Sequence, residues 1–405
     1  MSLLDKKELA KRLANGEKIT PQSIIDEFKF ILKDVIEEAT DAEIAEHLGY
    51  ERNEISDNPN CRNGYNTKTL KTNYGEIIVD IPRDRDGSFN PKLVKKREVV
   101  LNGTDDLVIS LYAKGMSVRD IKAHLEQLYG FELSEQTISN MTEKIVDKAK
   151  EWQNRPLEPV YAIVFIDATI LKIRIDGNVK NIATYIMLGI KLDGTKEVLG
   201  MWISKDSESS VYWLDIFNEI KNRGVNDILI VSTDNLTGIS KAINGSFPNT
   251  VVQKCVVHQI RNSLKYVSYK DRKKLANELK AIYEADTIDL AKLALDEFKE
   301  RHKHDFPNIA KSWENNWDEL TTYFRYSKPI RKLIYTTNPI ESLNSVIKRK
   351  TKAKSTFPTV ESAFKFMYLS ILELSDKWKT GKIRGWDRIY PQLTIYFSEI
   401  LERYE

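Results

Sequence analysis

The spacing of hydrophobic residues changes along the chain and predicts helices first, then strands, then helices again. Residues 1–60 follow the 3.6-residue period of an amphipathic helix, with a start signal at Thr20 and Pro21. The apolar stripe expected on the buried face of this helix is Ile24, Phe28, Ile31 and Val35. Alternating residues on both sides of Gly75 then predict two short strands.

Helical spacing returns at residues 97–153, where a short turn separates two helices. Ser117, with Asp120 three residues later, marks the start of the first helix, and Ser134 marks the start of the second. This layout is typical of a helix-turn-helix DNA-binding unit. The polar residues early in the second helix are then expected to contact DNA: Gln136, Thr137, Ser139 and Asn140. An ordinary helical hairpin has the same pattern and is the alternative.

Residues 156–260 have the patterns of strands. Turn signals at 176–177 and 193–194 divide three strand candidates and predict an antiparallel meander. Helix and strand patterns alternate after the meander. This order is that of the ribonuclease-H-like fold, so we predict an α/β core in which a mixed sheet has helices on both faces.

Residues 262–335 are helical and rich in aromatic residues, and we interpret them as an all-α insertion into this core. The stripe of Trp313, Trp317, Leu320 and Phe324 is expected to be core rather than a platform for stacked bases. The predicted organisation is a mainly helical N-terminal DNA-binding region followed by the interrupted core. Its segments are an N-terminal region with a small β element (1–95), the helix-turn-helix-like domain (96–155), the first part of the core (156–261), the insertion (262–335), and the completion of the core with C-terminal helices (336–405).

Composition narrows the possibilities further. Hydrophobic residues make up 41% of the chain, the net charge is +3, and no apolar run approaches the length of a membrane span. Two cysteines, Cys61 and Cys255, fit a reducing compartment. Positive charge is concentrated in residues 328–354, which hold eight Lys or Arg residues and one Glu.

Three carboxylates come at the ends or edges of the predicted buried structure. Asp167 interrupts an apolar strand, Asp234 follows another strand, and Glu341 precedes a cationic stretch of helix. Carboxylates rarely lie beside long apolar strands unless they are paired or bind a metal. Together with the cationic stretch, they suggest a divalent-metal site that acts on phosphodiesters.

Each carboxylate also has a structural explanation. Asp167 could face outward or pair with Lys172, and Asp234 could cap the following helix. Glu341 could complete a capping box that Asn338 opens. These alternatives stay open when the residues are taken singly.

A Cys-x-x-His pair, Cys255 and His258, lacks the second pair that a four-ligand zinc site needs. Taken by itself, this pair is interpreted as a packed cysteine beside a hydrogen-bonded histidine.

Several long motifs, in this order, resemble the bacterial Mutator-type insertion-sequence transposases: VFIDATILKIR, RGVNDILIVSTDNLTGISKAI, FPNTVVQKCVVHQIRNSL and TTNPIESLNSVIKRKTK. The resemblance extends over nearly the whole chain and implies a ribonuclease-H-like core of the Asp-Asp-Glu type. It assigns catalysis and metal binding to Asp167, Asp234 and Glu341, and it places Cys255 and His258 on the Cys-x-x-His motif of the family as supporting residues. An α-helical insertion would separate the second Asp from the Glu.

The resemblance implies a DNA transposase that binds the terminal inverted repeats of an insertion sequence and carries out metal-dependent strand cleavage and strand transfer. The implied cofactor is a pair of Mg²⁺ ions, for which Mn²⁺ can substitute. The implied partners are double-stranded end and target DNA and a second subunit in a homodimer, in the bacterial cytoplasm at the nucleoid rather than at a membrane. Residues expected to contact DNA near the carboxylates are Arg261, Asn344, Lys348, Arg349, Lys350, Lys352 and Lys354.

Two other functions remain as alternatives. One is a DNA-binding regulator derived from a transposase that has lost its chemistry, and the other is a ribonuclease-H-like nuclease that cuts DNA without joining it. The cationic stretch could also be a solvated run of charge without a partner.

Overall fold

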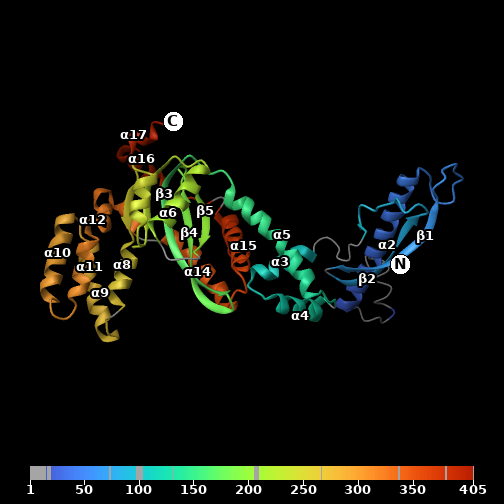
Figure 1. The fold of residues 1–405 in the computed structure, drawn as a ribbon, viewed down its shortest axis with the longest axis horizontal. Coiled ribbons are helices and arrows are strands. Elements are labelled where there is room, and N and C mark those ends of the chain that lie inside the picture. The colour runs from blue at the N-terminus through green and yellow to red at the C-terminus, as the bar shows by residue number, and fades with distance from the viewer. Residues whose placement is uncertain are drawn as a thin grey trace. The chain divides into compact units, whose positions relative to one another are not determined.

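The computed structural model describes residues 15, 20–72, 74–96, 104–129, 131–204, 209–265, 267–335, 338–378 and 381–404, with residues 338, 353 and 377 described by their backbone alone. The chain divides into two compact units, Met1–Lys144 and Ile145–Glu405 (Figure 1). No helix in the described part of the chain combines the length and the apolar content that crossing a bilayer requires.

The smaller unit begins with a long helix packed on a hairpin. Helix α2 spans Pro21–Leu48, and Thr20 caps it in a reciprocal arrangement with Ser23. Strands β1 (Arg62–Thr72) and β2 (Gly75–Asp84) pair antiparallel, which confirms the two strands predicted around Gly75. Both strands are longer than the short strands predicted, because β1 already begins at Arg62 and β2 continues to Asp84.

The stripe predicted for the buried face of α2 is wrong. Ile24, Phe28 and Val35 are 49%, 40% and 54% exposed. The hairpin covers a different face instead, through Leu32 and Ile36. This helix carries apolar residues on more than one face, and only the position of the hairpin decides which of them becomes core.

Three further helices follow in the smaller unit: α3 (Thr104–Ala113), α4 (Val118–Tyr129) and α5 (Glu135–Asn154), the last of which runs past the unit boundary. Both predicted caps are confirmed. The amide of Asp120 donates to Ser117 Oγ at 3.2 Å, and the amide of Thr137 donates to Ser134 Oγ at 3.1 Å. Residues 131 and 133 are buried in the turn, so packing as well as capping holds the two helices together.

A five-stranded mixed sheet forms the core of the larger unit. Its strands are β3 (Val160–Ile175), β4 (Asn178–Ile190), β5 (Lys196–Ile203), β6 (Asp227–Thr233) and β7 (Val251–Lys254), in the spatial order β5-β4-β3-β6-β7. The first three strands form the predicted antiparallel meander, and β6 and β7 continue the sheet in parallel with β3. Asp176 and Gly177 turn the first hairpin with φ angles of 52° and 79°, as a two-residue turn with both residues left-handed requires.

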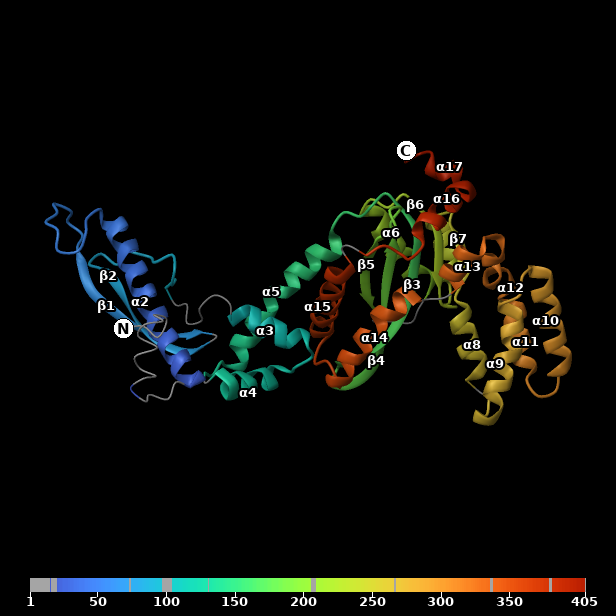
Figure 2. The same ribbon diagram turned by 180° about the vertical axis from the view of Figure 1, so that it is seen from behind.

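Helices cover both faces of this sheet (Figures 1 and 2). On one face, α6 (Ser210–Asn222) and α7 (Ile239–Ser246) pack on side chains that include Val164 and Ile166. On the other, α14 (Asn338–Ala353) and α15 (Val360–Trp378) contact β3, because residues 163, 165 and 167 alternate to that side. Strand β3 extends beyond the end of β6, and Phe357 pairs with its free edge through Arg174 N, at 2.9 Å, and Lys172 O, at 2.8 Å.

The predicted helical block lies at the β7 edge of the sheet (Figure 2). Gln253 on β7 binds this block twice, since its amide donates to Leu320 O at 2.8 Å and accepts from Tyr323 N at 2.7 Å. Trp313, Leu320 and Phe324 are buried, as expected of a core stripe. Helical structure begins six residues before the predicted boundary at 262, with α8 (Val256–Leu264). The block continues with α9 (Tyr269–Tyr283), α10 (Ile288–Arg301), α11 (Pro307–Asn315), α12 (Trp317–Leu320), the 3₁₀ helix η1 (Thr322–Arg325) and α13 (Lys328–Tyr335).

The chain ends in two short helices, α16 (Trp386–Tyr396) and α17 (Ser398–Leu401). Trp386 lies against Gly194 in the turn between β4 and β5, and its indole N–H donates to Leu192 O at 2.9 Å. The C-terminal segment is therefore attached to the far end of the meander.

Phe217 on α6 tests the core of the larger unit. Its side chain is fully buried and contacts the ring of Phe247 edge to face. We expect Phe217→Ala to lower the free energy of unfolding by about 3–5 kcal/mol, because it removes a buried ring and leaves a cavity. Urea unfolding followed by circular dichroism would measure this, with the partly exposed Leu214→Ala as the matched control on the same helix. Equal losses in the two variants would contradict this view of the core.

Candidate active site

Asp167 lies on β3, on the face that α14 covers, and only 5% of its surface is exposed. Its Oδ1 accepts from the amide of Ala168 at 2.8 Å, and its Oδ2 accepts from the side-chain amide of Asn344. Neither an outward orientation nor a pairing with Lys172 therefore accounts for this carboxylate.

Asp234 follows directly on β6. The parallel register pairs Ile166 with Thr233, so the next residues along the two strands are Asp167 and Asp234. Helix α7 begins only at Ile239, with Gly238 at its N-cap and no side-chain capping bond. The helix-cap explanation of Asp234 is therefore wrong, and strand pairing brings the two aspartates together.

His258 joins these two carboxylates. Its Nδ1 pairs with Asp234 Oδ1, and its Nε2 lies 3.9 Å from Asp167 Oδ1. Cys255 is buried at the start of α8, and its amide donates to Thr233 O at 2.8 Å, which ties this helix to the end of β6. The Cys-x-x-His spacing thus positions the imidazole over the carboxylates.

Burial and the charges of neighbouring groups shift the pKa values of Asp167 and His258. Burial, helped by the neighbouring charge of Asp234, raises the pKa of Asp167 to about 6. Burial opposes the charge on His258, but its bonds to Asp234 and Cys255 outweigh this and raise its pKa to about 10. At neutral pH a cationic imidazole therefore balances part of the negative charge of the two aspartates.

Glu341 joins the same network through Arg261. Arg261 Nη2 donates to Glu341 Oε1 at 2.8 Å, and Arg261 Nη1 lies 3.5 Å from His258 Nε2. Both side chains retain access to solvent, at 58% for Arg261 and 32% for Glu341. The predicted cap at Asn338 lies outside the described residues, since the side chain of residue 338 and all of residues 336 and 337 are not among them.

Asn344, one turn after Glu341 on α14, is 2% exposed. Its Nδ2 donates to Asp167, and its Oδ1 has no partner in the described part of the chain. This buried position does not fit the direct DNA contact expected from the sequence. In the sequence, the spacing of three residues between Glu341 and Asn344 already indicated that both side chains lie on one face of the helix.

A family model described as "Transposase, Mutator family" matches residues 4–381. The chain belongs to the Mutator family of transposases. It is 41% identical over 399 residues to a protein of Rhizobium meliloti named "Transposase for insertion sequence element ISRM3", with 97% of this chain and 98% of the relative covered. A probable transposase of an ISRM3-like element from Sinorhizobium fredii is also 41% identical, with the same coverage. The transposase of IS256 in transposon Tn4001 from Staphylococcus aureus is 29% identical over 87% of this chain and 91% of its own length.

The cationic stretch of this transposase divides into two groups along α14 and just beyond it. Lys348, Arg349 and Lys352 are exposed. Lys350 instead pairs with Glu373 at 2.7 Å, and the ammonium group of Lys354 lies 5.1 Å from the centroid of the Phe357 ring. Only the exposed group is available to a phosphate without breaking an existing contact.

The polar residues early in α5 lie in the smaller unit of the transposase. Gln136 and Asn140 are exposed, and the amide of Gln136 donates to Asn140 Oδ1 at 2.7 Å. Thr137 and Ser139 are half-buried, and Thr137 takes part in the cap at Ser134. The bond between Gln136 and Asn140 is therefore exposed, while Thr137 supports the start of the helix.

The donor atoms around Asp167 fit a hard divalent cation. Carboxylate oxygens of Asp167 and Asp234 and the unpartnered, buried Oδ1 of Asn344 are oxygen ligands of the kind that Mg²⁺ prefers. A second set, Asp234, Cys255 and His258, has its ligand atoms within 4.8 Å of one another. Sulfur and imidazole suit Zn²⁺ better than Mg²⁺, so Cys255 and His258 differ in kind from the oxygen donors beside Asp167.

Replacing Asn344 by Leu should destabilise the transposase, because it removes a donor from a buried carboxylate. The bond from Asn344 lowers the pKa of Asp167, so its loss raises that pKa further above the unfolded value. The destabilisation caused by Asn344→Leu is fully present above the pKa of Asp167 in the folded protein. It disappears as the pH falls and Asp167 becomes protonated. We expect about 1–3 kcal/mol at pH 8 and less at pH 5, from urea unfolding with a chelator present.

Ser345→Ala, an exposed change on the same helix, is the control for this variant. A cost for Asn344→Leu that is equal at pH 5 and pH 8 would show that the effect comes from packing rather than from the bond to Asp167.

Proposed function

We propose that this transposase cleaves and joins DNA at the ends of its insertion sequence, with Asp167, Asp234 and Glu341 as its catalytic carboxylates. The observation that carries this proposal is the parallel register of β3 and β6, which brings two distant aspartates together. Helix α14 adds Glu341 through Arg261 and adds Asn344 directly. Three carboxylates from separate parts of the chain in one connected network are typical of phosphodiester chemistry.

The topology of the sheet supports a ribonuclease-H-like core for this site. An antiparallel meander of three strands is extended by two parallel strands beside its first member, with helices on both faces. We infer that the helical block at the β7 edge is an insertion between Asp234 and Glu341.

Asp167, Asp234 and Glu341 would hold two Mg²⁺ ions, or Mn²⁺ in their place, with the Oδ1 of Asn344 close by. Such ions supply an activated attacking oxygen and stabilise the leaving oxygen of a phosphodiester. The residues of the chain prepare this chemistry: Asn344 and the amide of Ala168 orient Asp167, and His258 orients Asp234.

In the proposed reaction, water first attacks the phosphodiester at the end of the element and releases a 3′-hydroxyl. That hydroxyl then attacks a phosphodiester of a second DNA, so that one P–O bond forms as another breaks. Arg261 is placed to transfer its bond from Glu341 to an incoming phosphate. The relatives named as transposases of insertion sequences support element ends as the substrate. Because two ends must be joined, we infer that the transposase acts as a homodimer.

The helix-turn-helix helices α4 and α5, with exposed Gln136 and Asn140, are proposed to bind the terminal repeats. Lys348, Arg349 and Lys352 are proposed to contact the DNA backbone, which positions DNA without reading its sequence.

Replacing each carboxylate by its amide tests the chemistry. We expect Asp167→Asn, Asp234→Asn and Glu341→Gln each to lower Mg²⁺-dependent nicking of labelled end DNA by more than about 100-fold, the largest cost usual for losing a partner outside the ligand set. End binding, measured with a chelator present, should stay near that of the wild type. Glu361→Gln, an exposed change at the start of α15, is the control. Full cleavage by any one of the three variants would remove that residue from the site, and tight end binding by the wild type without cleavage under Mg²⁺ or Mn²⁺ would instead indicate a regulator.

Neutralising the exposed cations of α14 should weaken DNA binding regardless of sequence. For Lys348→Gln, Arg349→Gln and Lys352→Gln combined, the slope of log affinity against log salt should become shallower by about 2.7 if each residue neutralises one phosphate. Fluorescence anisotropy in a salt series would measure it. Lys350→Gln, whose charge already pairs with Glu373, should leave the slope nearly unchanged. An unaltered slope in the triple variant would show that this is a solvated run of charge.

A further inference from the structure

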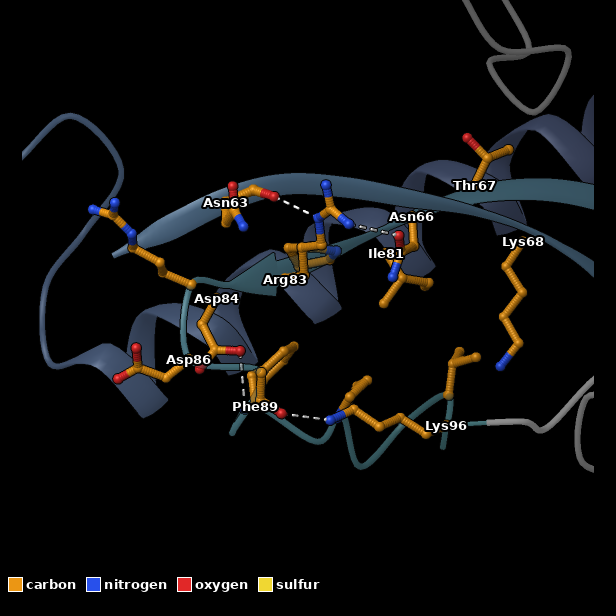
Figure 3. Close-up of a pocket in the computed structure, with 15 residues that line it drawn as sticks. Asn63, Asn66, Thr67, Lys68, Ile81, Arg83, Asp84, Asp86, Phe89 and Lys96 are labelled. Carbon is orange, nitrogen blue, oxygen red and sulfur yellow. Dashed lines mark hydrogen bonds between the residues drawn. The ribbon is translucent and has the colours of Figure 1, made fainter. Parts of the chain in front are cut away.

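The smaller unit contains a hollow of about 660 Å³, between the hairpin and the segment that follows it up to residue 96 (Figure 3). This volume is in the range of sites that bind small organic ligands or single residues of a polymer. All of its lining belongs to residues 63–96, so the hollow lies entirely within one unit.

Four cations line this hollow: Lys68, Arg83, Arg85 and Lys96. Arg83 Nε donates to Asn63 O at 2.6 Å, and Lys96 Nζ donates to Gly87 O at 2.9 Å. Figure 3 shows Arg83 on the strand side and Lys96 along the opposite wall. Neutral carbonyl oxygens thus hold Arg83 and Lys96 in place without neutralising them. None of the carboxylates in the described ranges pairs with Arg83, Arg85 or Lys96.

Two acids, Asp84 and Asp86, also line the hollow, so its four cations exceed its carboxylates by two. Asp84 is buried and accepts bonds from Asn60, from the amide and hydroxyl of Ser88 and from the amide of Phe89. Burial opposes its ionisation, but these four bonds hold its pKa well below the usual range. Asp84 therefore stays ionised while it holds the turn after β2, and Asp86 is exposed beside the cations.

The floor of the hollow is apolar. Ile81, Phe89 and Val94 line it and also belong to the hydrophobic clusters of the unit. Cations on an accessible surface are sufficient to bind the phosphate backbone of a duplex. Cations around an apolar floor instead suit a ligand that carries both a phosphate group and an exposed base ring. A nucleotide whose base is not paired has this composition.

We propose that this hollow binds an unpaired nucleotide segment of a DNA strand. Arg83, Arg85 and Lys96 bind phosphates of the segment, and a sugar and its base lie over Phe89 and Ile81. The inference rests on the proposed function, because cleavage of one strand at an element end releases a strand end that can leave its duplex. It gives the hairpin and the segment after it a ligand different from the paired repeats assigned to α4 and α5.

Binding of a labelled oligothymidine to the full-length protein tests this inference. Fluorescence anisotropy would be measured in a salt series with a chelator present, so that no cleavage occurs. We expect Arg83→Gln with Lys96→Gln to weaken single-strand binding at least 10-fold and to make the salt slope shallower by about 1.4, since each cation lost gives up about 0.7 on single strands. Binding of duplex end DNA should change less than 3-fold.

Lys92→Gln is the matched control, because Lys92 is exposed in the same segment but does not line the hollow. If the double variant fails to fold, Arg85→Gln replaces it, since the Arg85 side chain makes no bond in the described part of the chain, and a slope shallower by about 0.7 is expected.

Two results with the double variant would overturn the inference: unchanged single-strand binding, or an equal loss of binding to single strands and to duplex. A third would be displacement of the oligothymidine by thymidine monophosphate at a concentration equal to the dissociation constant of the oligothymidine, because a free nucleotide would then bind as tightly as the strand. The proposed function fails separately. A protein that cleaves element ends but binds single strands normally without these cations refutes the hollow alone, whereas single-strand binding through the hollow without any cleavage refutes the catalytic proposal alone.

Discussion

The parallel pairing of β3 with β6 is the constraint on which the larger unit depends. It places Asp167 and Asp234 side by side at the point where β6 ends, and it therefore concentrates negative charge in a place that the sheet and α14 largely exclude from water. The surrounding elements are explained by the need to compensate this charge. Helix α8 brings His258, α14 brings the amide of Asn344, and Arg261 extends the network to Glu341. Because the compensation comes from cations and an amide of the chain itself, the chain offsets the cost of burying its own acidic centre.

The long separation between Asp234 and Glu341 along the chain does not loosen the geometry of the site. The helical block that fills this interval is bound to the sheet at its β7 edge, where Gln253 uses both ends of its amide on backbone groups of the block. Ser232 on β6 adds a bond to Ile334 O at 3.0 Å, just before α14 begins. The block therefore leaves the sheet at β7 and contacts it again at Ile334, seven residues before Glu341.

Local signals in the sequence were sufficient for the elements but not for their partners. The Asp-Gly turns and the alternation of β3–β5 predicted the meander, and Ser117 and Ser134 predicted helix starts, because turns and caps depend on neighbouring residues. Asp167 and Asp234 could be singled out for the same reason, as charges that interrupt or directly follow apolar strands, whereas Glu341 was singled out by its place before a cationic stretch of helix. The buried face of α2 and the burial of Asn344 could not be predicted, since each is decided by an element distant in sequence. Likewise, the sequence marked Arg261 as a cation without indicating that it pairs with Glu341.

The short pairing of Phe357 with β3 has a consequence for the aggregation of this protein. Where β3 runs beyond β6, its edge would otherwise present unpaired amide and carbonyl groups, which are a template for a strand of another molecule. The segment after α14 occupies this edge, with one bond in each direction. The same bonds hold the far end of α14, so one stretch of chain both blocks edge-to-edge aggregation and keeps the helix of Glu341 from swinging away from the sheet. A change that loosens this contact is therefore expected to reduce solubility and to disturb the geometry of the site together.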